Sequence, residues 1–172
     1  MVKLHTNHGI ITIELDDKRA PQTVANFLQY VAEGHYSKTV FHRVIDGFMV
    51  QGGGFEPGMK QKPTRPPVKN EADNKVKNAA YTLAMARTSD PHSASAQFFI
   101  NVADNVPLDF RFPTPEGYGY TVFGKIVKGM DVVSRIVKVP TGPGPAPHAN
   151  VPVKPVVIEQ ARVVETAKPA AK

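Results

Sequence analysis

Hydrophobic and polar residues alternate near both ends of the chain, as they do in β-strands that bury one face. Residues 2–6 and 10–15 follow this alternation on either side of Asn7-His8-Gly9, which predicts a hairpin. Residues 156–164 repeat the pattern near the C-terminus. Because successive side chains of a strand point to opposite faces, these segments indicate a sheet with one buried face.

Two other segments have the periodicity of a helix. In the longer one, apolar side chains recur at intervals of three and four residues: Val24, Phe27, Leu28 and Val31. Pro21 suits the first turn of this helix, and Gly34 suits its C-terminal cap. Residues 130–137 place apolar side chains on one face and predict a second, shorter helix.

Further apolar runs bounded by turn residues predict more strands. They cover residues 40–45, 48–51, 81–86, 97–102 and 118–127. Asp46-Gly47 predicts a tight turn between the first two, and the proline- and glycine-rich stretches 52–78 and 141–155 predict loops. The sum is about eight strands and two helices, a pattern typical of a β-barrel whose open ends are covered by helices.

Size and composition indicate one globular domain. The chain has 172 residues, of which 41% are hydrophobic and 21% charged. We expect residues 1–164 to form the domain and residues 165–172 to be a disordered tail. No apolar run approaches the ~18 residues of a membrane span, and the N-terminus lacks the apolar core of a signal peptide, so we expect a cytoplasmic protein without membrane contact. Because no long exposed apolar stripe is evident, we also expect a monomer.

Several kinds of chemistry find no support in the residues. The chain has no cysteine, no Gly-x-Ser-x-Gly elbow, and histidines without metal-ligand spacing. Gly52-Gly53-Gly54 lacks the Lys-Ser/Thr of a phosphate loop. The net charge is +6, but the basic residues are spread along the chain and do not interleave with aromatics. We therefore expect no metal, no cofactor and no nucleic-acid partner.

The segment FHRVIDGFMVQGGG, residues 41–54, is the strongest candidate for a site. It places Arg43 in a strand-like apolar run. A guanidinium keeps its charge in proteins and is costly to bury, so an open groove with apolar walls is the expected setting. In a second segment, AMARTSDPHSASAQFFINV, residues 84–102, Gln97 and Phe99 share one strand parity and are predicted to face the same groove.

Four segments in order, VANFLQYVAEGHY, FHRVIDGFMVQGGG, AMARTSDPHSASAQFFI and YTVFGKIVKGMDVV, resemble the cyclophilin-type peptidyl-prolyl isomerases, and most of all their short bacterial cytoplasmic form. The resemblance runs from Val2 to about Val164. It implies a mainly β fold, a closed eight-stranded antiparallel β-barrel capped by two α-helices. It also implies an enzyme that assists protein folding by rotating X-Pro peptide bonds, with its site on the outer surface of the barrel.

The site of this family carries over to individual residues. The resemblance implies a catalytic role for Arg43, Phe48 and Gln51. It implies substrate binding by Met49, Ala86, Arg87, Thr88, Gln97, Phe99, Leu108 and Tyr120. Phe48 and Met49 are neighbours, so both can line one pocket only if the strand twists or bulges there.

Two departures from the family pattern bear on ligands. Members that bind cyclosporin well have a tryptophan before the residue matched by Leu108, whereas this chain has Pro107 there and no tryptophan. We therefore expect weak cyclosporin binding. Tyr120 stands where the family often has histidine. The expected partners are proline-containing peptides and unfolded or folding proteins. Two alternatives are a proline-peptide binding module or holdase, and a basic protein associated with RNA.

Overall fold

The computed structural model describes residues 1–145 and 148–164, so the predicted tail lies outside the described residues. One antiparallel sheet dominates the fold, with strand order β3-β13-β1-β2-β10-β8-β9-β5-β4. Its strands are β1 (Val2–Thr6), β2 (Gly9–Leu15), β3 (Thr39–Val40), β4 (Arg43–Ile45), β5 (Met49–Gly52), β8 (Thr82–Met85), β9 (Phe98–Asn101), β10 (Val122–Lys128) and β13 (Val157–Val163). This confirms a mainly β architecture.

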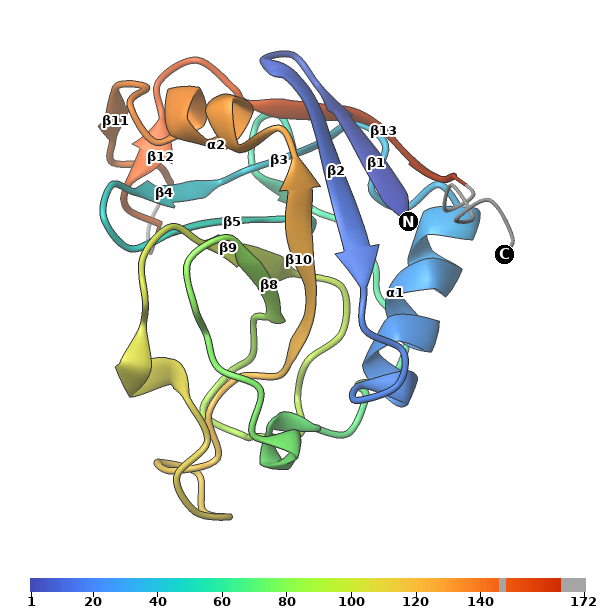
Figure 1. Cartoon of the computed structure of the whole chain (residues 1–172). Coiled ribbons are helices and arrows are strands. Elements are labelled where there is room, and N and C mark those ends of the chain that lie inside the picture. Colours follow the sequence, from blue (N-terminus) through green and yellow to red (C-terminus); the bar gives the residue numbers. More distant parts are fainter. Residues whose placement is uncertain (146–147, 165–172) are drawn as a thin grey trace.

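The two edges of the sheet come from neighbouring parts of the chain. The predicted strand 40–45 divides at Phe41 and His42 into β3 and β4, which lie at opposite ends of the strand order. The Phe41 N–H donates to Val156 O at 2.9 Å, and the Val44 N–H donates to Asn150 O at 2.9 Å. Since only two residues separate β3 from β4, the sheet must curl upon itself, and Figure 1 shows it wrapped around the core.

Both predicted helices are present and pack against the curled sheet at different places (Figure 1). Helix α1 (Pro21–Ala32) buries Thr23, Val24, Phe27, Tyr30 and Val31, and α2 (Met130–Ile136) buries Val132, Val133 and Ile136. Helix α1 has Pro21 at its start, as predicted. Glu33 is its C-cap, and Gly34 follows with φ +74°, the left-handed conformation common just after a helix.

Aromatic side chains fill the interior between α1 and the sheet. The Phe98 ring lies edge-on to the rings of Phe27, Tyr36 and Phe41, with centroid distances of 5.6, 5.5 and 6.1 Å. All four side chains are fully buried. Such edge-to-face contacts add to the free energy gained by burial of the rings.

The stretches predicted as loops contain short regular elements. Residues 52–78 hold the hairpin β6 (Phe55–Glu56) and β7 (Lys60–Gln61) and the 3-10 turn η1 (Ala72–Asn74). Residues 141–155 hold β11 (Thr141–Gly142) and β12 (Val151–Pro152). Another 3-10 turn, η2 (Val106–Leu108), precedes β10. Strands of two residues are too short to produce a periodic pattern, so they could not be predicted from the sequence.

Strand β10 begins four residues later than predicted. Gly119 has φ +77°, and the Tyr120 N–H donates to Leu108 O at 3.0 Å instead of joining the ladder. The segment before Val122 therefore packs against η2.

Near the two ends of the described chain, β1 pairs with β13, with Val2 opposite Val163. In the described parts of the chain, neither helix has the length and apolar character to cross a bilayer.

Candidate active site

Strand alternation divides the apolar residues of the central strands between two clusters. Val50 and Ile100 point into the main core, whereas Met49 and Phe99 belong to a smaller cluster on the opposite face. Phe99 pairs across the ladder with Gln51, whose side chain shares the face of Met49. The register of β5 and β9 thus brings residues from two distant motifs together on the outer face of the sheet.

Phe48 lies outside the strand, so the rule that neighbouring strand residues face opposite sides does not separate it from Met49. It ends a tight turn, in which its N–H donates to Ile45 O at 3.1 Å and Gly47 has φ +78°. Strand β5 begins only at Met49. No twist or bulge is needed, because the turn itself directs Phe48 toward the outer cluster.

A small pocket of about 150 Å³ lies over this outer cluster. Nine of the predicted site residues line it: Arg43, Phe48, Met49, Gln51, Ala86, Arg87, Phe99, Leu108 and Tyr120. They come from β4, the turn between β4 and β5, β5 itself, β9, η2 and the loops that follow β8 and precede β10. The volume is below the ~300 to 1,000 Å³ typical of pockets for whole small molecules, and suits a single apolar side chain.

A chain of polar side chains forms one edge of this pocket. The Arg43 side chain is exposed, and its Nη1 lies 3.5 Å from Gln51 Oε1. Gln51 Nε2 in turn donates to Gln97 Oε1 at 3.0 Å. This second hydrogen bond orients the Gln51 amide so that its oxygen faces Arg43. The guanidinium therefore stands at the rim of an apolar pocket with most of its donors free for a ligand.

Arg87 holds the opposite edge. Its Nε donates to Gly119 O at 2.9 Å and its Nη1 to Thr88 O at 2.8 Å. The guanidinium carbon lies 4.6 Å from the centre of the Tyr120 ring, a cation–π contact. Arg87 thus ties the loop after β8 to the segment before β10 and fixes the Tyr120 ring at the pocket.

Two of the predicted residues lie beside the pocket instead of in its wall. Thr88 and Gln97 line an adjoining hollow of about 260 Å³, which shares Gln51, Ala86 and Arg87 with the pocket. The Ala86 N–H donates to Gln97 O at 3.0 Å. The structure therefore gathers all eleven predicted residues into two connected depressions.

Comparison with known proteins bears on what this surface does. Residues 1–163 match the family model described as cyclophilin type peptidyl-prolyl cis-trans isomerase/CLD. The chain belongs to the cyclophilin-type peptidyl-prolyl cis-trans isomerases. The expectations of this family and of an isomerase enzyme are thereby confirmed.

Bacterial relatives match this cyclophilin over nearly its whole length. Peptidyl-prolyl cis-trans isomerase B of Escherichia coli is 58% identical over 165 residues, which cover 96% of the chain and 100% of the relative. The cyp18 isomerase of Streptomyces antibioticus is 57% identical over 95% of the chain and 98% of the relative. Among solved structures, a Cryptosporidium parvum cyclophilin in the presence of the dipeptide Ala-Pro has a TM-score of 0.79 and 26% identity, and covers 96% of the chain and 99% of its own.

His42 was not identified from the sequence as a residue beside the cyclophilin site. His42 lies between Phe41 and Arg43 in the FHR motif, but its 5% exposure places it inside the protein. Its ring lies 4.6 Å from that of Phe55 and 5.9 Å from that of His148. These rings line a further hollow of about 440 Å³, which shares Arg43 and Gln51 with the pocket. The motif contained the residue, but the long-range pairing with His148 has no signal in sequence.

We expect His42 to make the stability of this cyclophilin depend on pH. Burial, with smaller effects of His148 and Arg43, lowers the pKa of His42 from 6.5 to about 4. The unfolded chain therefore binds more protons between these values, so stability is full above pH 6.5 and is lost as pH falls toward 4. The loss reaches about 3 kcal/mol, because each pKa unit corresponds to ~1.4 kcal/mol. Urea unfolding at pH 7.5, 5.5 and 4.5 measures it.

The control for this pH dependence is His42→Gln, which removes the titrating group. His35 is half-buried and its pKa is also lowered, mainly by burial, so it contributes with the same sign and stays in both proteins. We expect the variant to lose a smaller fraction of its stability between pH 7.5 and 4.5. Parallel pH profiles of the two proteins would show that His42 is not the group responsible.

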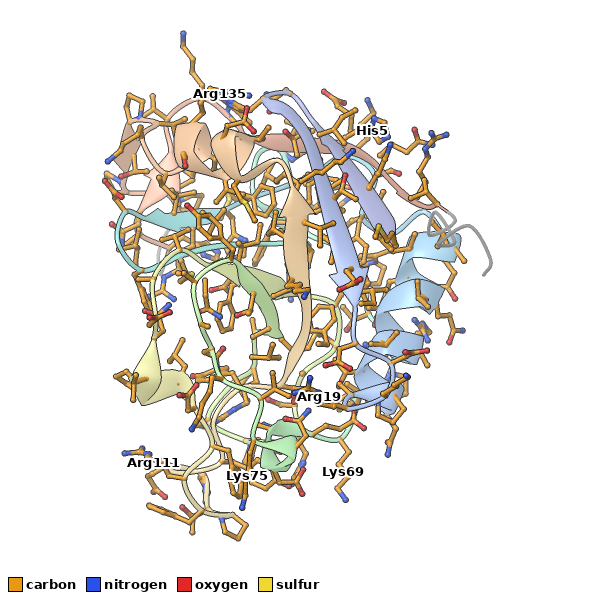
Figure 2. All side chains as sticks on the ribbon, viewed as in Figure 1. His5, Arg19, Lys69, Lys75, Arg111 and Arg135 are labelled. Carbon is orange, nitrogen blue, oxygen red and sulfur yellow. The ribbon has the colours of Figure 1, made fainter. Side chains whose placement is uncertain are left out.

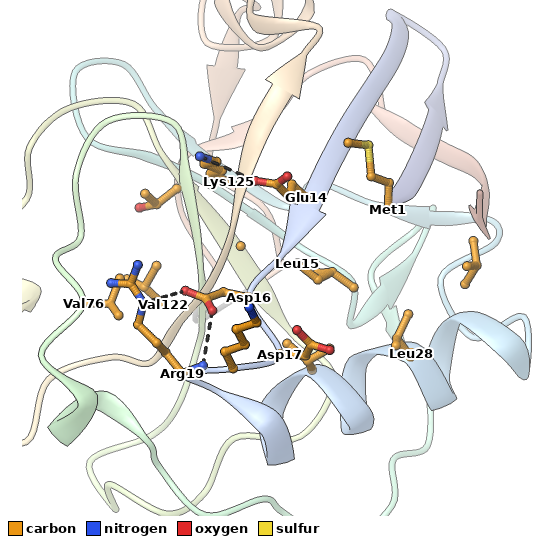
Figure 3. Close-up of a pocket in the computed structure, with 15 residues that line it drawn as sticks. Met1, Glu14, Leu15, Asp16, Asp17, Arg19, Leu28, Val76, Val122 and Lys125 are labelled. Carbon is orange, nitrogen blue, oxygen red and sulfur yellow. Dashed lines mark hydrogen bonds and ion pairs between the residues drawn. The ribbon is translucent and has the colours of Figure 1, made fainter. Parts of the chain in front are cut away.

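A larger hollow of about 640 Å³ lies elsewhere, where β2 ends and α1 begins (Figure 3). Leu15 and Leu28 are among its apolar residues. At its rim Arg19 Nε lies 3.2 Å from Asp16 Oδ2, and Lys125 Nζ lies 3.5 Å from Glu14 Oε1. None of the predicted site residues lines it, although all of them are described. Its size alone therefore does not make it the active site of this cyclophilin.

Proposed function

We propose that this cyclophilin rotates X-Pro bonds in peptides and folding proteins, that the small pocket holds the proline ring, and that Arg43 is the catalytic residue. The observation that carries the proposal is the position of Arg43. It is a charged donor at the rim of a pocket whose walls are Phe48, Met49, Phe99 and Leu108. The Ala-Pro dipeptide present with the Cryptosporidium parvum structure supports a proline ligand for this fold.

The reaction explains why a fixed donor is sufficient. Rotation about a peptide bond meets a barrier of ~18 to 20 kcal/mol that comes from amide resonance. At the twisted transition state this resonance is lost, and the prolyl nitrogen gains lone-pair character. A cationic donor near that nitrogen binds the twisted form more strongly than either planar form, and only such differential binding accelerates the step. No bond breaks, so the reaction requires no nucleophile.

The geometry suggests a division of labour among the site residues. The apolar walls hold the proline ring still, while Arg43 and Gln51 meet the rotating amide. In this proposal, the backbone near Arg87, which adjoins the pocket, holds the chain that precedes proline. The acyl part then turns against a fixed ring. Because Gln51 is oriented by Gln97, the polar edge is preorganised and needs little rearrangement during the reaction.

Cis-to-trans isomerisation of a short X-Pro peptide tests the proposal directly. Uncatalysed exchange takes tens to hundreds of seconds, so a catalytic amount of folded protein must shorten it. A protein that only binds proline peptides, or only holds unfolded chains, would leave the rate unchanged or lower it. Absence of turnover by folded wild type would contradict the isomerase proposal and favour the binding module.

We expect cyclosporin to inhibit this turnover only weakly. Pro107 occupies the place before Leu108 and is the second residue of η2, so the pocket has no indole at this edge. A tryptophan there would offer both a large apolar face and an N–H donor. Titration of cyclosporin into the isomerase assay measures the effect. Complete inhibition at a cyclosporin concentration equal to that of the protein would show that the indole is dispensable.

The placement of basic residues supports proline-containing chains over RNA as partners. Figure 2 shows Arg135 at one end of the molecule and Arg19, Lys69 and Lys75 at the other. Arg19 and Arg135 also pair with Asp16 and Asp131. The labelled basic residues thus lie at both ends of the molecule and two of them are paired, which favours a spread of charge over a stripe along which a phosphate backbone could lie. The cytoplasmic location and the monomeric state stay predictions from the sequence.

A further inference from the structure

Three buried asparagines form a hydrogen-bonded relay behind the pocket. Asn78, Asn101 and Asn105 are 2%, 0% and 8% exposed. Asn105 Nδ2 donates to Asn101 Oδ1 at 2.7 Å, and Asn101 Nδ2 donates to Asn78 Oδ1 at 3.0 Å. Burial of an amide is costly unless its polar atoms are paired. A paired row of three amides in one place is therefore a feature that the fold must maintain.

The two ends of this relay bond to the backbone of the pocket walls. Asn105 Nδ2 also donates to Phe48 O at 2.9 Å. Asn78 Nδ2 donates to Leu108 O at 3.0 Å and lies 3.3 Å from Tyr120 O. The three wall residues come from the turn before β5, from η2 and from the segment before β10. The relay thus joins three segments that lie outside the strands, and it adds to their backbone hydrogen bonds, from the Val102 N–H to Phe48 O at 3.0 Å and from the Tyr120 N–H to Leu108 O at 3.0 Å.

We propose that Asn78, Asn101 and Asn105 are positioning residues that set the spacing of the walls of the proline pocket. The inference rests on the proposed function of that pocket. The relay contacts the walls that hold the ring. Among the described residues, it makes no hydrogen bond to the side chains of Arg43, Gln51 and Gln97. Its loss should therefore weaken substrate binding and leave the catalytic electrostatics in place.

Asn105→Leu tests the relay with little change in side-chain shape. The variant removes the donor to Phe48 O and to Asn101 Oδ1, so the turn that carries Phe48 loses its tie to the relay. We expect KM for an X-Pro peptide to rise about tenfold and kcat to stay within about threefold, the scale set by loss of one buried hydrogen bond. Asn105→Ser keeps a hydroxyl donor and a smaller volume, and should raise KM about threefold.

Thr39→Val is the matched control. It removes another buried hydrogen bond to a carbonyl, from Thr39 Oγ1 to Tyr36 O at 2.6 Å, at a residue that does not line the pocket. A merely structural loss reduces the fraction of folded enzyme, which lowers the apparent kcat and leaves KM unchanged. We expect this pattern for Thr39→Val. The opposite pattern, a raised KM, is expected for the Asn105 variants.

An unchanged KM in folded Asn105→Leu and Asn105→Ser would overturn the inference, whatever happens to kcat. Failure of the proposed function has a different signature, since it shows as absence of turnover by the wild type. In that case the relay is tested by NMR titration of wild type and variants with an Ala-Pro peptide. A dissociation constant raised about tenfold in Asn105→Leu would support the relay, and an unchanged one would refute it.

Discussion

Arg43→Ala is expected to lower kcat/KM for an X-Pro peptide by about 100- to 1,000-fold, the range seen when one preorganised electrostatic donor is removed. The Arg43 side chain is exposed, and the one hydrogen bond it makes among the described residues, to Gln51, is long at 3.5 Å. Little of the folding free energy therefore depends on it. The loss should fall on the transition state, with the circular dichroism spectrum and the urea midpoint close to wild type.

Two further variants sharpen this measurement. Arg162→Ala removes an exposed arginine from β13, away from the pocket, and should leave turnover unchanged. Arg43→Lys keeps the positive charge but loses the planar set of donors. Partial activity of this variant would show that the charge alone supplies part of the catalytic effect and the donor geometry supplies the rest. If folded Arg43→Ala turned over the peptide at nearly the wild-type rate, another group would have to stabilise the twisted amide.

Phe98→Ala is expected to lower the free energy of unfolding by about 3 to 5 kcal/mol, as measured by urea denaturation. The ring is fully buried and packs edge-on against Phe27, Tyr36 and Phe41, so its removal leaves a cavity between α1 and the sheet. Three surrounding rings are rigid and cannot easily close the space. A change below about 1 kcal/mol would show that the core collapses around the missing ring.

The next residue in the chain provides the comparison. Phe99 faces the outer cluster and lines the pocket, whereas Phe98 faces the main core. Phe98→Ala should therefore keep kcat/KM per folded molecule close to wild type under conditions where the variant is folded. Phe99→Ala should lose activity through a higher KM. A large loss of activity per folded molecule in Phe98→Ala would mean that the two faces are coupled.

The fold was predictable from sequence where an element is long and its pattern is set by burial on one face. Helix α1 and strands β1, β2 and β13 lie where their periodicity predicted them. The prediction was wrong where neighbouring residues join different partner strands. The run 40–45 divides at Phe41 and His42, because each half pairs with a different part of the chain. No local pattern contains that choice.

The site divides in a similar way between what sequence shows and what it does not. Arg43, Gln97 and Phe99 stood out through motif and parity, and the resemblance supplied Gln51, Leu108 and Tyr120. The sequence did not show that Phe48 lies in a turn, since Asp46-Gly47 was known only as a hairpin signal. Nor did the sequence reveal the asparagine relay, because the spacing of asparagines along the chain does not show which side chains hydrogen-bond to one another in the fold.

The position of β13 within the sheet affects how the protein can fold while it is being synthesised. This last strand lies between β3 and β1 in the sheet. Strands β1 and β3 are made early, but the strand that pairs with both of them is complete only when residue 163 has been synthesised. At ~5 to 20 residues per second on the ribosome, the roughly 150 residues from the end of β2 to the end of β13 take about 7 to 30 seconds, and throughout that time the β1 edge of the N-terminal hairpin stays unpaired.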